Sequence, residues 1–130
     1  MADFRFQRGE KLKSRKEIER LFQAGSQACM QYPLRLVWRP MEQRRSEFPV
    51  QMTVSVSKKR FKRAVDRNRI KRLVREAYRL QKPQLYEGIG EAEKQLAWMI
   101  IFVGKEMPEY RRIEKSMRKL QAKFFRQYGE

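Results

Sequence analysis

The sequence predicts an α+β fold, a sandwich in which three helices cover a sheet of about four strands in the order α-β-β-β-α-β-α. Three observations lead to this prediction. Apolar and polar residues alternate over residues 50–57, an unbroken apolar run fills residues 96–103, and further segments carry apolar residues at helical spacing. The chain has 130 residues, the usual size of one domain, so we expect residues 1–130 to form a single unit around one core.

The first elements are an extended lead-in, residues 1–13, and a short helix. Ser14, with Glu17 three residues later, forms the pattern of a capping box at the start of this helix. Gly25 is placed to end it. The apolar residues that share one face of this helix are Ile18, Leu21 and Phe22.

Strands follow this helix. Residues 33–39 alternate in polarity, and residues 26–32 can hold a further short strand. A polar loop bracketed by prolines, residues 40–49, leads into residues 50–57, which place four apolar residues on one face and Gln, Thr and Ser on the other. This pattern is typical of an antiparallel sheet with one covered face.

Two long helices flank the last strand. The first is expected over about residues 62–81, ended by Pro83, with residues 86–94 as a loop. Residues 96–103 form a strand that is apolar on both faces, and residues 108–128 form an amphipathic helix. Its inward stripe is Tyr110, Ile113, Met117, Leu120 and Phe124.

The charge balance points to a polyanionic partner. Lys and Arg number 32 against 15 Asp and Glu, a net charge of +17. The surplus positive charges repel one another in the compact state but attract polyanions, and the strength of that attraction depends strongly on salt. Nucleic acid is the first candidate partner and an anionic membrane surface the second.

The composition argues against catalysis by the protein itself. There is no histidine, one cysteine (Cys29) and only two aspartates, Asp3 and Asp66. The commonest general base, Cys/His zinc sites and the converging carboxylates of two-metal nucleases are therefore missing. We expect no catalytic residue and no metal site, and we expect Cys29 to be a small buried apolar residue. The sequence shows no signal peptide and no apolar run long enough to span a membrane, so a cytoplasmic protein is expected.

Basic residues concentrate in one helix and the loop before it. Residues 58–82 contain only two acids, Asp66 and Glu76. Exposed helices are normally stabilised by interleaved charges of both signs, and an unbalanced face is instead typical of a polyanion-binding surface. The basic residues of this segment are Lys58, Lys59, Arg60, Lys62, Arg63, Arg67, Arg69, Lys71, Arg72, Arg75, Arg79 and Lys82.

At these residues the chain resembles a known family. SVSKK, followed four residues later by AVDRNRIKRLVREAYR, is similar to the signature of the bacterial ribonuclease P protein subunit. FQRGEKLKSRKEIERLF also resembles that family's amino-terminal segment and first helix. The resemblance runs over about residues 6–82 and continues in element order alone.

The resemblance implies a four-stranded sheet with a left-handed βαβ crossover around the basic helix. It also implies a catalytic RNA partner that removes the 5′ leader from precursor tRNA, with Mg²⁺ held mainly by the RNA. Precursor tRNA would be the second partner, bound through its leader in a cleft between the first helix and the sheet. No membrane and no protein partner are indicated.

The charge pattern and the resemblance together assign two sets of residues. Contacts to RNA are expected from Lys58, Lys59, Arg63, Arg67, Asn68, Arg69, Lys71, Arg72, Arg75 and Arg79. The resemblance alone implies that the leader cleft is lined by Ile18, Phe22, Leu36 and Ser55. Ile18 stands where many members carry phenylalanine, and Trp38 is either a replacement stacking ring or a core residue.

Three alternatives stay open at this stage. A ribosomal or ribosome-associated RNA-binding protein would share the basic surface, although it would not explain the SVSKK strand beside the basic helix. A DNA-binding or membrane-surface protein lacks a supporting motif, such as a helix-turn-helix or an aromatic-rich insertion face. A free-standing nuclease lacks the acid and base residues.

Overall fold

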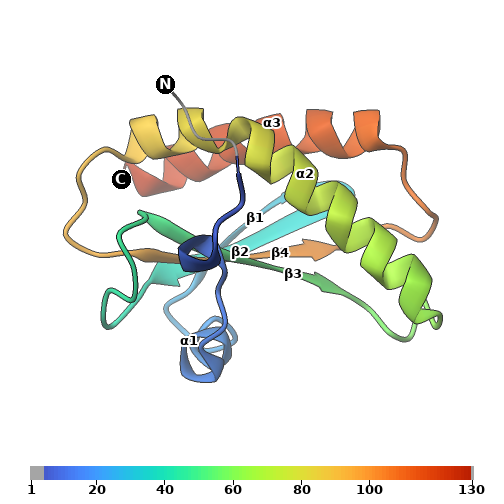
Figure 1. The fold of residues 1–130 in the computed structure, drawn as a ribbon, viewed down its shortest axis with the longest axis horizontal. Coiled ribbons are helices and arrows are strands. Elements are labelled where there is room, and N and C mark those ends of the chain that lie inside the picture. Colours follow the sequence, from blue (N-terminus) through green and yellow to red (C-terminus); the bar gives the residue numbers. More distant parts are fainter. Residues whose placement is uncertain (1–4, 130) are drawn as a thin grey trace.

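The computed structural model describes residues 5–129 and confirms the α+β class. A short 3₁₀ turn, η1, precedes three α-helices and four strands in the predicted order (Figure 1). The elements are η1 (Arg8–Glu10), α1 (Arg15–Arg20), β1 (Gln27–Gln31), β2 (Leu34–Pro40), β3 (Val50–Val56), α2 (Ala64–Ile89), β4 (Leu96–Phe102) and α3 (Tyr110–Tyr128).

The four strands form one mixed sheet in the order β1-β2-β4-β3. β1 pairs with β2 and β2 with β4 in antiparallel fashion, whereas β3 pairs with β4 in parallel. The expectation of an antiparallel partner for β3 is therefore wrong. The reason is α2, which carries the chain back to the end of the sheet where β3 began, so that β4 runs in the same direction.

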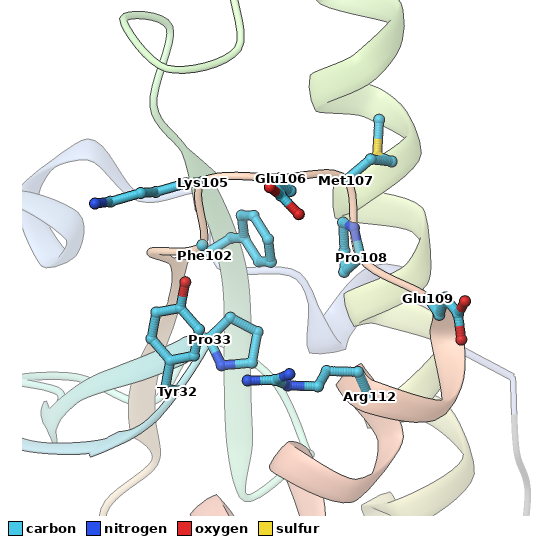
Figure 2. A pocket seen from close by; sticks show the side chains of 10 residues that line it. Tyr32, Pro33, Phe102, Lys105, Glu106, Met107, Pro108, Glu109 and Arg112 are labelled. Atoms are coloured by element: carbon cyan, nitrogen blue, oxygen red, sulfur yellow. The ribbon is translucent and has the colours of Figure 1, made fainter.

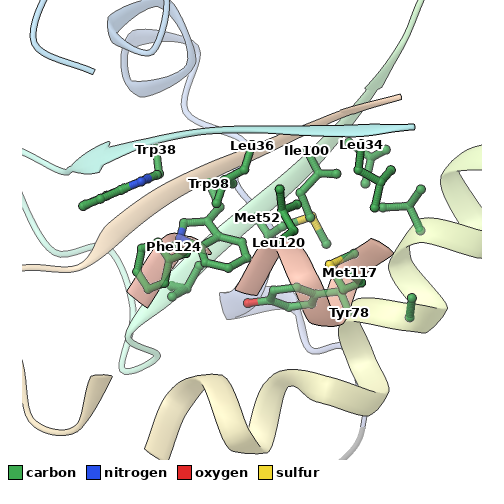
Figure 3. Packing of buried hydrophobic residues seen from close by; sticks show 14 of the residues in the cluster. Leu34, Leu36, Trp38, Met52, Tyr78, Trp98, Ile100, Met117, Leu120 and Phe124 are labelled. Atoms are coloured by element: carbon green, nitrogen blue, oxygen red, sulfur yellow. The ribbon is translucent and has the colours of Figure 1, made fainter. Parts of the chain in front are cut away.

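Helices α2 and α3 cover one face of the sheet, and α1 lies on the other (Figure 1). The main core fills the space under α2 and α3, where alternate residues of β2, β3 and β4 meet the apolar stripes of both helices (Figure 3). β4 lies in the middle, and Trp98 and Ile100 are fully buried there. The rings of Trp38 and Trp98 each lie 4.9 Å from that of Phe124.

A smaller apolar cluster covers part of the opposite face. It joins Leu21, the residue that caps the end of α1, and Leu12 of the preceding segment to Val37, Ala97 and Met99 of the sheet. This cluster holds α1 against β4 and leaves the rest of that face open. The apolar run of β4 follows from this arrangement, because both of its faces are packed.

Helix α2 extends well beyond its predicted end. Pro83 lies inside the helix, which continues to Ile89 and ends at Gly90 with φ +67°. A proline lacks the N–H that bonds to the carbonyl four residues earlier, and this normally ends or kinks a helix. Here Leu85 and Ile89 are buried in the main core, so packing carries the helix past the proline.

Helix α1 is shorter than predicted, with six residues, and is anchored at both ends. Ser14 caps its first turn by accepting a hydrogen bond from the Glu17 N–H. The Glu17 carboxylate does not complete a capping box but accepts from Arg20 and from the Glu42 N–H. Arg39 of β2 donates to the carbonyls of Arg20 and Ala24, which ties the end of α1 to the sheet.

Two aromatic or aliphatic residues considered for the leader cleft belong to the core instead. Leu36 is 0% exposed and lies on the face covered by α2 and α3, so its assignment to the cleft is wrong. Trp38 lies on the same face, and its indole N–H donates to Gln127 of α3 at 2.8 Å. Alternation along β2 sends both side chains away from α1.

Cys29 packs half-buried against the main core. Burial raises the pKa of its thiol, with the charge of Lys123 acting in the opposite direction. Cys29 therefore stays protonated at neutral pH and acts as a small apolar side chain, as expected.

Replacing Leu36 tests its placement. We expect Leu36→Ala to lower the free energy of unfolding by about 2–5 kcal/mol, because it leaves a cavity beneath two helices. Urea denaturation followed by circular dichroism measures the change. Leu80→Ala, which truncates an exposed leucine of α2, is the matched control and should change stability by less than about 0.5 kcal/mol. A Leu36→Ala effect as small as the control would contradict the core position.

Candidate nucleic-acid interface

A groove of about 450 Å³ lies at the free edge of the sheet. The segment before α1 forms one wall, β3 forms the floor, and α2 forms the other wall. The residues that line the groove are Phe6, Lys11, Leu12, Lys13, Met52, Thr53, Val54, Lys71 and Arg75. Lys71 and Arg75 are one helical turn apart, so both side chains project from the same face of α2.

The groove carries positive charge from both walls. Lys11 and Lys13 contribute from one wall, Lys71 and Arg75 from the other, and the residues that line it include no acid. Thr53 adds a hydroxyl on the floor. Phosphate groups suit such a site, because ammonium and guanidinium groups donate charge-assisted hydrogen bonds to them.

The first wall is held in place by a buried ion pair. The Lys82 ammonium of α2 lies 2.7 Å from the Glu10 carboxylate of η1, and both side chains are almost completely excluded from solvent. Lys82 also donates to the Arg5 carbonyl, and the Tyr86 hydroxyl donates to the second oxygen of Glu10. Lys82 was counted with the basic surface, but it is a buried structural residue.

The neighbouring tyrosines support this pair. Burial is the main cause that raises the pKa of Tyr86 above its usual value, and Tyr78 and Glu10 act in the same direction. Tyr86 therefore stays protonated and remains a donor to Glu10. Phe6 packs edge-on against Tyr78, with ring centroids 5.9 Å apart. Further along, the Leu12 N–H donates to the Met52 carbonyl, which fastens the segment to β3.

The predicted RNA-contacting residues of α2 and the preceding loop differ in solvent exposure and in the contacts that their side chains make within the protein. Arg67 donates to the carbonyls of Phe61 and Lys62, so its guanidinium shapes the loop that enters the helix. Arg79 is paired with Glu76, and this contact holds the pKa of the Glu76 carboxyl below its usual value. The exposed members of the set are Lys58, Lys59, Arg63, Asn68, Arg69, Arg72 and Arg75, and Lys71 is half-buried at the groove.

Three of the four predicted leader-cleft residues lie on the α1 side of the sheet. Phe22 follows α1 and is 71% exposed, and Ile18 packs on the edge of the smaller cluster. Ser55 of β3 is paired in register with Ile101 of β4, which borders the same cluster. These three residues do not line the groove at the β3 edge, which is lined partly by residues that sequence reasoning did not select.

Lys11 and Lys13 are the charged groove residues that the sequence analysis did not assign to a site. They were assigned only to an extended lead-in. A signal for them is present, because these two lysines come directly before the capping residue Ser14 and so must lie near the start of α1. Their meeting with Lys71 depends on the Glu10–Lys82 pair, which joins residues 72 positions apart in the chain.

The sandwich, the edge groove and the basic face of α2 define a small RNA-binding protein. In the part of the chain that the structure describes, no helix has the length and apolar character that a membrane span requires. The family model for Ribonuclease P matches residues 6–124. This chain belongs to the ribonuclease P protein family, as its sequence signature predicted.

Curated relatives and solved structures agree with this assignment. A ribonuclease P protein component from Porphyromonas gingivalis (strain ATCC 33277) is 43% identical over 118 residues, covering 91% of this chain and 85% of the relative. One from Chlorobaculum tepidum is 37% identical over 120 residues, covering 85% and 77%. The RNase P protein of Staphylococcus aureus has the same fold, with a TM-score of 0.68, 17% identity and coverage of 88% and 94%. That of Thermotoga maritima gives a TM-score of 0.65 at 19% identity, covering 87% and 96%.

Removing the buried ammonium tests how the groove wall is held. Lys82→Met leaves Glu10 buried without its cation, and we expect a loss of about 3–5 kcal/mol in the free energy of unfolding. Urea denaturation measures the loss, and hydrogen exchange at residues 6–13 reports whether the wall loosens.

The matched control is Arg79→Met, three residues earlier in α2, which breaks the solvent-exposed pair with Glu76 and should have little effect. Adding Glu10→Gln to Lys82→Met should recover part of the loss, because the uncompensated charge is gone. Equal effects of Lys82→Met and Arg79→Met would show that the buried pair does not anchor the wall.

The groove cations can be ranked by their salt dependence. We expect Lys71→Ala and Arg75→Ala each to weaken RNA binding and to reduce the slope of log K against log salt by about 0.7–0.9. Arg79→Ala should reduce it less, because Glu76 already neutralises that guanidinium. Filter binding to the ribonuclease P RNA at several salt concentrations measures the slopes, and identical slopes for all three variants would contradict the ranking.

Proposed function

We propose that this chain is the protein subunit that assists an RNA-catalysed removal of the 5′ leader from precursor tRNA. It binds the catalytic RNA through the exposed cations of α2 and its preceding loop, and it holds the leader near the edge of the sheet. Family membership supports this role. Its mechanism is binding and positioning, with the protein screening the repulsion between two RNAs.

The acid-free groove carries the proposal. Its two cationic walls face each other across β3, so that a single-stranded backbone would meet lysine or arginine on both sides. The continuous basic face of α2 leads away from the groove and provides room for a second, larger RNA. Exposed Phe22, on the other side of the sheet edge, offers a ring for an unpaired base.

The residues present fit a binding role rather than a hydrolytic one. Among residues 5–129, no three Asp, Glu, His or Cys side chains gather at one place. The proposal assigns Mg²⁺ and the hydrolytic chemistry to the RNA. The structural alternative, a ribosomal RNA-binding protein, draws no support from the family match.

A reconstitution tests the role. The protein is mixed with the catalytic RNA at low magnesium and supplied with precursor tRNA or mature tRNA. We expect the protein alone to cleave neither, and to tighten binding of the leader-bearing substrate more than that of mature tRNA. Cleavage by the protein alone, or equal effects on both substrates, would overturn the proposal.

Phe22 provides a sharper test of leader contact. Phe22→Ala should weaken binding of the leader-bearing substrate by about 1–3 kcal/mol, the usual worth of one base stacked on a ring, and leave mature tRNA unaffected. Leu80→Ala is the control for loss of an exposed apolar side chain. If the two variants bind both substrates alike, Phe22 does not touch the leader.

A further inference from the structure

Two neighbouring hollows lie away from the groove, where the β1–β2 turn meets the loop between β4 and α3. The larger has a volume of about 400 Å³ and the smaller about 260 Å³. Tyr32 and Arg112 line both, so these two side chains form the ridge between them. Neither hollow shares a lining residue with the groove at the β3 edge.

The larger hollow combines apolar residues with charged residues of both signs. Phe102 points into it and Pro108 lies opposite, while the side chain of Met107 is directed away from Phe102 (Figure 2). Its charged residues are two cations, Lys105 and Arg112, and two acids, Glu106 and Glu109. A neutral planar group suits this hollow, since the rings of Tyr32 and Phe102 offer contact area and the Glu106 carboxylate can accept hydrogen bonds from N–H groups.

The smaller hollow has the opposite character. It contains the cations Arg112, Lys115 and Lys119, and the residues that line it include no acid. Lys115 and Lys119 are one helical turn apart, and Arg112 precedes Lys115 by three residues, so all three cations project from one face of α3. An anion of phosphate type suits this hollow.

The ridge between the hollows is held in place before any ligand binds. The Arg112 guanidinium carbon lies 5.5 Å from the centroid of the Tyr32 ring. Buried Ser116 donates to the Tyr32 carbonyl at 3.0 Å, which ties the β1–β2 turn to α3. The Tyr32 side of this ridge is nevertheless open, because the residue is 50% exposed.

We propose that these two hollows bind one unpaired RNA nucleotide, with the base against Tyr32 in the larger hollow and the phosphate among Arg112, Lys115 and Lys119. The charge division carries this inference, since a base is neutral and planar while its phosphate is anionic. Paired bases are excluded by their stacking within a duplex, so the partner is a single-stranded segment. The protein thus has a second RNA-binding surface, separate from the groove, and can hold two RNA segments at once.

Nuclear magnetic resonance on the isotope-labelled full chain tests the proposal. The titrants are a nucleoside 5′-monophosphate, the nucleoside alone and inorganic phosphate. We expect the nucleotide to shift the signals of Tyr32, Phe102 and Arg112 saturably. It should bind more tightly than the nucleoside alone or inorganic phosphate alone. Phosphate binding as tight as the nucleotide would reveal an anion site only, and the absence of saturable shifts would show no site; each result overturns the proposal.

Single substitutions distinguish binding at the two hollows from nonspecific attraction of the nucleotide to the basic protein. Arg112→Ala should weaken nucleotide binding about tenfold, the usual effect of losing a charge-assisted hydrogen bond. Arg111→Ala, an exposed cation next to it that lines neither hollow, should leave binding unchanged. Equal losses would overturn the proposal, as would tighter binding of an acidic peptide or of anionic lipid vesicles. The Lys71→Ala/Arg75→Ala background should not alter the result, so failure here leaves the groove assignment untouched.

Discussion

The buried ion pair between Glu10 and Lys82 is the contact on which the binding surface depends. The segment before α1 has little regular structure, and its backbone forms a bridge to β3 between Lys11 and Met52. Ordering such a segment costs conformational entropy that one bridge does not offset. The ion pair, the Tyr86 hydroxyl and the Phe6 ring supply further contacts, together with Ser46 and Gln51, which both donate to the Gly9 carbonyl. They place two lysines opposite Lys71 and Arg75, and without them the groove would have one wall.

The two faces of the sheet serve different purposes, one for stability and the other for recognition. One face is closed by α2 and α3 and holds nearly all of the large buried side chains, so it can tolerate little change. The other face is only partly covered by α1, and it presents Phe22 and Ser55 around a small apolar cluster. Helix α2 serves both purposes, since one side packs in the core while the other carries cations. The cations on that helix repel one another, but the burial of its long apolar stripe, which continues past Pro83, offsets this repulsion.

Local patterns were sufficient for much of the fold, and long-range contacts explain where they failed. Alternation in β3, the apolar run of β4 and the stripe of α3 each reflect one element packing against a layer, and all three were predicted. The end of α2 was misplaced because a proline rule is local, whereas the burial of Leu85 and Ile89 is tertiary. Leu36 was assigned to the cleft by resemblance, and only the pairing of β2 shows which face it occupies. The basic face of α2 was predicted from charge, but no local signal reveals that Lys82 turns inward to Glu10 or that Arg67 binds the carbonyls of its own loop.

The open edge of β3 has a consequence for the protein without its RNA. An edge strand offers unpaired backbone groups on which a second copy could build a longer sheet, the usual beginning of aggregation. Here Lys11, Lys13, Lys71 and Arg75 crowd around the strand. Two copies that approached edge to edge would bring these like charges together without counterions. The charges that attract RNA thus also keep the free chains apart, and this protection weakens as salt screens them.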